Sequence, residues 1–160
     1  MGSQNQNYNL AYIAGFLDGD GSLMLQVKKR HDIKSGWRLM ATICFYQDSR
    51  HDKSLSWIRN RLGIGYISKR RDGITELRIN GYRQVEQILK RLLPYIRFKK
   101  KQTKIMIKAL GLLIRMKSKN LKKRNMLRLV GYLLKIQNYN YKSHQKKSRQ
   151  ELLKRLGLTP

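Results

Sequence analysis

Two carboxylates stand out in a chain that has few of them. Asp18 and Asp20 lie in the tetrapeptide Asp18-Gly19-Asp20-Gly21, whereas the whole sequence has 9 Asp and Glu against 36 Lys and Arg. The single cysteine, Cys44, and three scattered histidines lack the spacing of a structural zinc site. Any metal is therefore expected to bind through oxygen, which is the ligand that Mg²⁺ and Ca²⁺ prefer.

A short apolar segment positions these carboxylates. The run from Leu10 to Leu17 follows Asn9, a favourable N-cap residue, and leads into the Asp-Gly repeat, which ends a helix. The sequence thus predicts a short helix over 10–17. Because this helix is apolar on nearly every face, we expect it to be buried on several sides.

The predicted helix also carries small residues. Ala11, Ala14 and Gly15 recur at helical spacing, and small side chains let two helix backbones approach closely. Packing inside one subunit is the alternative explanation. The segment occurs once, so a second chain would have to supply the partner helix, which predicts a C₂ dimer. The residues expected in this interface are Ala11, Ala14, Gly15, Leu17 and Asp18.

A two-fold interface of this kind would bring two Asp20 carboxylates together. Both would lie at C-terminal helix ends, where the negative helix dipole and the like charges disfavour them as purely structural groups. The same arrangement suits divalent cations.

The segment Leu10–Gly21 resembles the LAGLIDADG motif, and Ala14-Gly15-Phe16-Leu17-Asp18-Gly19-Asp20-Gly21 is its matching core. The resemblance is to the one-motif, homodimeric branch of the LAGLIDADG homing endonucleases. It implies a hydrolase that cuts both strands of a long pseudo-palindromic DNA site and thereby serves intron homing. The implied cofactor is Mg²⁺, with Mn²⁺ expected to substitute and Ca²⁺ expected to bind without cleavage.

The resemblance also assigns roles to individual residues. It implies that Asp20 is a direct metal ligand and that the Gly19 carbonyl is a backbone ligand, whereas Asp18 is expected mainly to be a capping or hydrogen-bonding residue near the motif. Gln47, at the end of the second predicted strand, would order solvent around the nucleophile. Lys99 would stabilise developing negative charge.

Several of these assignments have alternatives. Gln47 could instead cap the end of its strand, and either neighbour of Lys99, Lys100 or Lys101, could take its role. Just after the second strand, where the family often has a basic residue, the chain offers Arg50 and His51 without a basis for choosing between them.

Strand and helix patterns predict the surrounding fold. Apolar and polar residues alternate over 22–30 and 37–46, and again over 66–70 and 74–80 around an Asp72-Gly73 turn, which predicts two hairpins. Helical spacing covers 48–62, 82–93 and 99–117, then 121–136 and 151–156. We therefore expect one α+β domain over 1–160, with an α-β-β-α-β-β-α core over about 8–117, a four-stranded antiparallel sheet and a helical C-terminal tail over 118–160.

The even-numbered strand positions predict a DNA-reading surface. Odd positions are mostly apolar and should face the helices, while even positions carry Arg, Lys, Gln and Asn, which suit base edges and phosphates. Strands of this length span roughly one turn of DNA. A solvated sheet face would show the same alternation. The expected DNA-binding residues of the sheet are Ser22, Met24, Gln26, Lys28, Arg30, Arg38, Met40, Thr42, Cys44, Tyr46, Tyr66, Ser68, Arg70, Glu76, Arg78 and Asn80.

Overall charge favours a nucleic-acid partner. The net charge of +27 is far beyond what solubility requires. Lys142, Lys146 and Lys147 are expected to contact phosphates beside the sheet, although a solvated loop explains them equally well. Apolar residues do not form a membrane-spanning run or a signal peptide, and one cysteine fits a reducing compartment, so we expect an intracellular protein without a membrane or small-molecule partner. Host organism and organelle stay open.

Two other functions are compatible with the sequence. One is a LAGLIDADG-type RNA maturase that assists intron splicing, and the other is a basic RNA-binding structural protein whose motif match is accidental. Asp20, Gln47 and a lysine near position 99 favour the nuclease, because a protein dedicated to RNA folding has no need of them.

Overall fold

The computed structural model describes residues 2–29, 31–32, 36–116, 123–140 and 146–158. The core elements follow the predicted order and are α1 (Gly2–Asp20), β1 (Gly21–Lys29), β2 (Trp37–Asp48), the 3₁₀ helix η1 (Ser49–His51), α2 (Lys53–Leu62), β3 (Tyr66–Lys69), β4 (Ile74–Asn80), α3 (Tyr82–Leu92) and α4 (Lys100–Met116). The tail contains α5 (Lys123–Tyr139) and α6 (Arg149–Arg155). None of these helices is long and apolar enough to cross a membrane.

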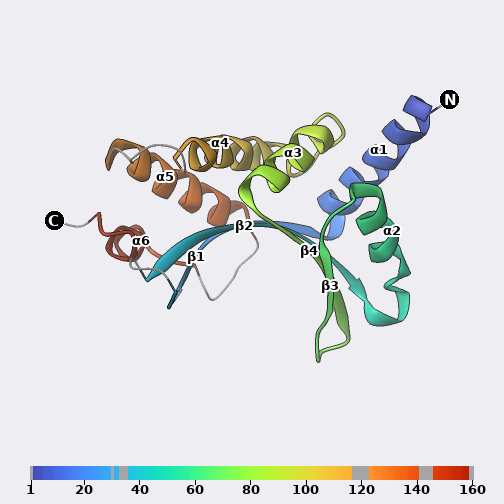
Figure 1. The fold of residues 1–160 in the computed structure, drawn as a ribbon, viewed down its shortest axis with the longest axis horizontal. Coiled ribbons are helices and arrows are strands. Elements are labelled where there is room, and N and C mark those ends of the chain that lie inside the picture. The colour runs from blue at the N-terminus through green and yellow to red at the C-terminus, as the bar shows by residue number, and fades with distance from the viewer. Residues whose placement is uncertain (1, 30, 33–35, 117–122, 141–145, 159–160) are drawn as a thin grey trace.

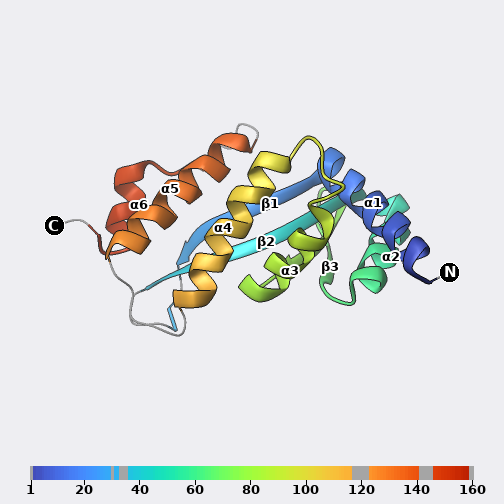
Figure 2. The same cartoon turned by 90° about the horizontal axis from the view of Figure 1, so that it is seen from above.

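The four strands form one antiparallel sheet in the order β1-β2-β4-β3. Gly21 faces Phe45 across the first hairpin, and Thr42 faces Asn80 where β2 meets β4. Helices α3, α4 and α5 lie side by side on one face of this sheet, as Figures 1 and 2 show from two directions. The opposite face is free of helices in these views.

The predicted division of the strands by parity is confirmed for the odd positions. Leu23, Ile43 and Phe45 are fully buried against the helices, as are Leu77 and Ile79 on β4. Removing this apolar surface from water is the main force that holds the helical layer to the sheet. The result is a twisted sheet whose odd face is covered by a continuous core and whose even face points away from helices α3, α4 and α5.

Helix α1 is longer than the sequence predicts. It begins at Gly2 rather than after Asn9, because the polar residues before Leu10 contain no proline and simply continue the helix into solvent, exposed from Gln4 to Tyr8. It ends at Asp20, inside the Asp-Gly repeat that is expected to terminate it but three residues beyond the predicted end at Leu17. Figure 1 shows the N-terminal half of α1 projecting past the sheet beside α2.

The segment after β2 divides into two helices instead of the single one expected over 48–62. Asp48 caps η1 by accepting the Arg50 N–H at 2.9 Å, and α2 follows from Lys53. Gly63 ends α2 at a φ of 71°, the left-handed conformation that favours glycine.

Side chains from α4 and from just after the end of α5 cover part of the free edge of β1. The main-chain carbonyl of Leu23 accepts hydrogen bonds from Gln102 Nε2 at 3.4 Å and from Asn140 Nδ2 at 3.3 Å. An uncovered strand edge invites pairing with another chain, so these amides protect the edge of the sheet next to α5.

Candidate active site

Asp18 joins the end of α1 to the start of α4. Its carboxylate accepts three main-chain N–H groups, from Arg97 at 2.6 Å, Phe98 at 3.2 Å and Lys99 at 3.0 Å. The N–H of Thr103 donates to the Lys99 carbonyl at 2.8 Å, so the first turn of α4 begins at Lys99. A carboxylate there offsets the positive helix end and satisfies donors that the helix itself leaves unpaired. The predicted capping role of Asp18 is confirmed.

Lys99 returns this contact through its side chain. Its ammonium donates to the main-chain carbonyl of Asp18, which points it at the C-terminal end of α1. Partial burial lowers the pKa of Lys99, and the charges of Asp18 and Asp20 oppose that shift. Lys100 and Lys101 are exposed on the outside of α4, so Lys99 is the member of the lysine run whose ammonium reaches the motif.

Asp20 is exposed at the last position of α1, next to the exposed Gly19. Both positions offer oxygen atoms, a carboxylate and a backbone carbonyl, which suits a hard divalent cation. Within the residues that the structure describes, no group of three or more His, Cys, Asp or Glu side chains could hold a metal.

Gln47 is the second-last residue of β2, two positions after Phe45. Phe45 pairs with Gly21, the first residue of β1. The Oε1 of Gln47 accepts a hydrogen bond from the N–H of Asp48 at 2.9 Å. This contact corresponds to the strand-end cap that the sequence allowed as an alternative role. This hydrogen bond uses only the carbonyl half of the side-chain amide. The strand register places Gln47 at the same end of the sheet as the C-terminus of α1.

Of the two basic residues after β2, Arg50 is held by Asp48. Its Nε and Nη2 donate to the two carboxylate oxygens at 2.9 and 2.8 Å, and this pairing holds the pKa of Asp48 well below its usual range. His51 is exposed, and its main-chain carbonyl accepts a bond from Ser54 Oγ at 3.3 Å.

The even face of the sheet is partly accessible, as predicted. Lys28, Arg38, Tyr66, Ser68 and Arg70 are exposed. The half-buried members of the same face are Ser22, Met24, Gln26, Met40, Tyr46, Arg78 and Asn80. They form a polar and basic surface on the side away from the helices. Arg30 and Lys142 lie outside the described residues.

Three predicted DNA-binding residues of this face are buried, which corrects the prediction for them. Thr42 is 4% exposed and donates to Asn80 Oδ1 at 2.6 Å, and Cys44 is 0% exposed. Both belong to the central strand β2, which is paired on both sides: Thr42 lies opposite Met24 and Asn80, and Cys44 opposite Ser22 and Arg78. Burial raises the pKa of the Cys44 thiol to about 11.

Glu76, the third, is 3% exposed and serves as a counter-ion rather than as an acceptor for a base. Its two oxygens bind Arg70 Nη1 at 3.2 Å and Arg78 Nε at 2.5 Å. Arg70 also pairs with Asp72 at 2.5 Å. This buried carboxylate fixes two guanidinium groups of the even face, a relationship that strand parity alone does not reveal.

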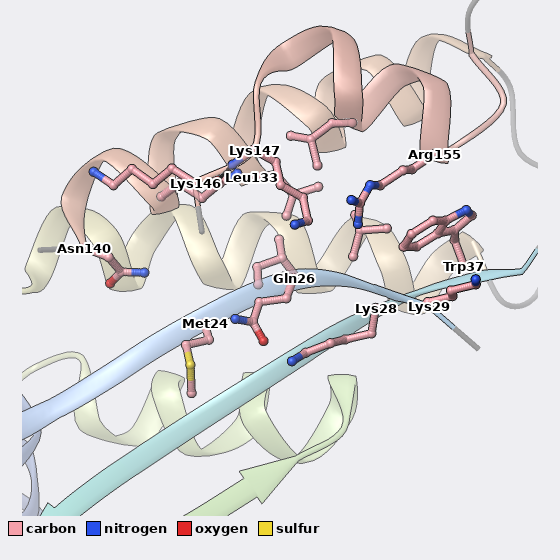
Figure 3. A pocket seen from close by; sticks show the side chains of 14 residues that line it. Met24, Gln26, Lys28, Lys29, Trp37, Leu133, Asn140, Lys146, Lys147 and Arg155 are labelled. Atoms are coloured by element: carbon pink, nitrogen blue, oxygen red, sulfur yellow. Dashed lines mark hydrogen bonds between the residues drawn. The ribbon is translucent and has the colours of Figure 1, made fainter. Parts of the chain in front are cut away.

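A basic pocket of about 320 Å³ lies between β1, α5 and α6 (Figure 3). Lys146 is exposed there, whereas Lys147 is half-buried and its main-chain N–H donates to Gln137 Oε1 at 2.8 Å. The Arg155 guanidinium lies 4.2 Å from the ring centroid of Trp37, a cation–π contact between α6 and the start of β2. Sequence reasoning missed this contact, because nothing in the spacing of the two residues relates them.

The expected dimer residues divide into two groups. Ala14 and Leu17 are fully buried and Asp18 is 7% exposed, so these three belong to the core of their own subunit and not to a helix surface. Gly15 is exposed and Ala11 half-buried. A Cβ added at Gly15 or at Gly19 would meet nothing within 4 Å, which shows an open backbone stripe along α1.

Aromatic side chains flank this open stripe. Tyr8 and Tyr12 are 69% and 60% exposed, and the Tyr12 ring packs edge-on against Trp57 of α2 at 5.5 Å. The Arg61 guanidinium lies 5.7 Å from the Trp57 ring. Large exposed aromatic groups beside two bare glycines are typical of a protein interface.

Known proteins share this sequence pattern. Residues 13–108 match the profile of the LAGLIDADG endonuclease family. The chain is 31% identical over 97 residues to the DNA endonuclease I-CvuI of Chlorella vulgaris, a match that covers 61% of this chain and 60% of that protein. It is 29% identical over 107 residues to the DNA endonuclease I-CreI of Chlamydomonas reinhardtii, which covers 65% of each. These matches span less than two thirds of either relative.

Solved structures share the fold. The crystal structure of the homing endonuclease I-CvuI in complex with its target, in the presence of 2 mM Ca, has a TM-score of 0.86 at 23% identity, covering 99% of this chain and 100% of that chain. The archaeal intron-encoded homing endonuclease I-Vdi141I complexed with DNA has a TM-score of 0.79 at 20% identity, covering 95% and 96%. The predicted α+β architecture, including the helical tail, is thereby confirmed.

Proposed function

Because its residues 13–108 match the family profile over more than half of the sequence, this chain belongs to the LAGLIDADG endonuclease family, and on that premise we propose that it is a homing endonuclease. It acts as a homodimer that hydrolyses both strands of a long, pseudo-palindromic DNA site inside the cell. The observation that supports this most directly is the exposed Asp20 at the end of α1, beside an ammonium group that Asp18 anchors.

The cofactor that fits is Mg²⁺, held by the Asp20 carboxylate and the Gly19 carbonyl. When bound, a divalent cation supplies an activated water and neutralises charge on the phosphate that is cut. Lys99 adds a positive charge next to the scissile phosphate, where it stabilises the pentacovalent transition state. The N–H of Asp48 donates to Gln47 Oε1, so the Gln47 side-chain nitrogen takes no part in that bond. Gln47 orders solvent through this nitrogen.

The dimer follows from the incomplete donor set. A single Asp20 and its neighbouring carbonyl do not surround a cation, and the open stripe of Gly15 and Gly19 suits close approach of a second α1. Tyr8 and Tyr12 then become buried by the partner. A second Asp20 completes the site at the two-fold axis.

The even face of the sheet reads the DNA. Exposed Lys28, Arg38 and Arg70 supply phosphate and guanine contacts, while Gln26 and Asn80 suit adenine. The solved relatives that are described as DNA complexes have this same sheet architecture.

Cleavage of a randomised DNA library tests this function. The full chain is incubated with Mg²⁺, and cut molecules are selected and sequenced. We expect one family of related pseudo-palindromic sequences from the wild type, and none with Ca²⁺ in place of Mg²⁺ or from Asp20→Asn.

A matched control removes a carboxylate elsewhere. Glu86→Gln on α3 changes charge to the same extent as Asp20→Asn, far from the end of α1, and should retain cleavage. Cutting by Asp20→Asn would exclude the proposed metal ligand. Binding of intron RNA without cleavage of any DNA by the wild type would favour the maturase alternative.

A further inference from the structure

The helical face of the molecule, opposite the reading face of the sheet, is strongly basic. Glu86 is the only acidic residue between Leu77 and Gln150, whereas residues 82–139 contain 17 Lys and Arg. The exposed basic side chains of this face are Arg83, Lys90 and Arg91 on α3, Lys100, Lys101, Lys104, Lys108 and Arg115 on α4, and Lys123, Arg124, Arg128 and Lys135 on α5. We call these twelve residues the helical basic face.

The helical basic face is organised along the helix axes. Lys101, Lys104 and Lys108 follow one another at helical spacing on α4, opposite the buried Met106 and Leu110. Arg124 and Arg128 repeat the pattern on α5, which packs beside α4 (Figure 2). Both stripes therefore point away from the sheet.

Little in the chain neutralises this charge. Glu86 pairs with Lys90 at 3.0 Å, and its Oε1 would lie 3.4 Å from a Cβ added at Gly111, so its effect is confined to the contact between α3 and α4. Lysines three and four residues apart repel one another along a helix. An external polyanion relieves this repulsion.

DNA lying on the sheet cannot reach these side chains, because the helical layer and the core separate the two faces. The charge is thus in excess of what one DNA-binding surface uses. We propose that the helical basic face is a second DNA-binding surface, which holds a separate duplex through its phosphates and lets the protein bridge two DNA segments.

The chemistry of the face favours a duplex held without sequence readout. Lysines on α4 act as point charges for phosphate rather than as bidentate readers of bases. From Lys101 to Lys108 the helix rises by about 10 Å, close to three base-pair steps of DNA. Along α3 and α4 the described residues expose no large aromatic side chain on which a single-stranded base could stack; the exposed Phe98 and Tyr139 lie just before α4 and at the last residue of α5.

Bridging by the full chain tests the inference directly. A 30-bp duplex on beads captures a second, fluorescent duplex of unrelated sequence through the protein, at low salt and without divalent cations. We expect Lys104→Gln with Lys108→Gln to raise the protein concentration needed for half-maximal capture at least fivefold. The matched control, Lys53→Gln with Arg59→Gln on α2, removes the same charge from exposed positions. It should change the concentration for half-maximal capture less than twofold.

Lysine acetylation provides an independent measurement. Excess unrelated duplex should slow the acetylation of Lys104 and Lys108 at least threefold, as read by mass spectrometry. Unchanged acetylation there, or unchanged capture by the α4 variant, would overturn the inference. So would a preference above tenfold for an RNA duplex as competitor, because it would assign the face to RNA. Neither readout depends on cleavage, so failure here is separate from failure of the endonuclease proposal.

Discussion

Asp18 at the end of α1 and Lys99 at the start of α4 are joined by two hydrogen bonds that run in opposite directions between side chain and main chain. Asp18 Oδ1 accepts the Lys99 N–H at 3.0 Å, and the Lys99 ammonium donates back to the Asp18 carbonyl. These two residues are far apart in the sequence, yet the pair fixes the position of one candidate catalytic group relative to the next, Asp20.

Replacing Asp18 should therefore destabilise the whole domain. Asp18→Ala removes the acceptor of three main-chain N–H groups at a buried position, which costs about 2 to 4 kcal/mol of the free energy of unfolding. Urea denaturation measures this loss. Asp72→Asn, in an exposed turn, should change the same free energy by less than about 0.5 kcal/mol. Equal effects of the two substitutions would contradict a capping role.

Lys99→Met should separate cleavage from folding. The methionine keeps the apolar stem but loses the charge, so the cleavage rate should fall about 100-fold, the usual effect of one transition-state contact. Binding of the target duplex in Ca²⁺ should stay within threefold. Lys100→Met is the control, since Lys100 is exposed and its loss should leave the rate almost unchanged. A larger loss from Lys100→Met than from Lys99→Met would transfer the role to the neighbour.

Glu76→Gln should weaken the fold and strengthen non-specific binding at once. The buried carboxylate neutralises Arg70 and Arg78, so its loss costs about 1 to 3 kcal/mol of unfolding free energy and frees two guanidinium groups for phosphates. Fluorescence anisotropy with unrelated duplex should show tighter binding with a steeper salt dependence. Weaker binding to every sequence would instead show that Glu76 positions the two arginines for DNA.

The order of the core elements and the buried face of the sheet were predictable, because strand alternation and helix spacing depend on the same apolar residues that form the core. Leu23, Ile43 and Phe45 illustrate this. The buried Thr42 and Cys44 were not predictable from parity, since their burial depends on β2 being the strand that is paired on both sides. Strand order and register, which decide this, come from contacts distant in sequence.

The candidate site also has one part that the sequence predicts and another that only the fold reveals. The motif itself identifies Asp20, and the structure adds why Asp18 precedes it, a hydrogen-bonding role that needs the position of α4. The pairing of Arg50 with Asp48 and of Arg155 with Trp37 depends on rotamers and packing, which residue spacing does not encode.

Cys44 predicts how stability responds to alkaline pH. Burial raises the pKa of its thiol from 9.0 to about 11, so the folded state keeps a proton that the unfolded chain loses. Stability from this group is complete below about pH 9 and is lost as pH rises toward 11. Urea midpoints measured across this interval should fall more steeply for the wild type than for Cys44→Ala. Parallel curves would show that the thiol does not titrate differently on folding.

Gly15 provides the sharpest test of the dimer. Gly15 is exposed and a Cβ added there meets nothing within 4 Å in its own subunit, so Gly15→Leu should not destabilise the folded monomer. If two α1 helices meet at this stripe, the leucine holds their backbones apart, and light scattering should report a monomer for the variant and a dimer for the wild type. Cleavage of both strands should disappear together with the dimer.

Gly131→Leu on α5 is the matched control, because it is also a helical glycine whose added Cβ meets nothing within 4 Å. Leucine has the higher helix propensity, so each substitution should raise monomer stability by roughly 0.5 to 1 kcal/mol. Only the change at position 15 should alter the molecular mass. A Gly15→Leu dimer that still cuts DNA would rule out close packing of the two α1 helices, and with it the shared cation site that needs both Asp20 carboxylates.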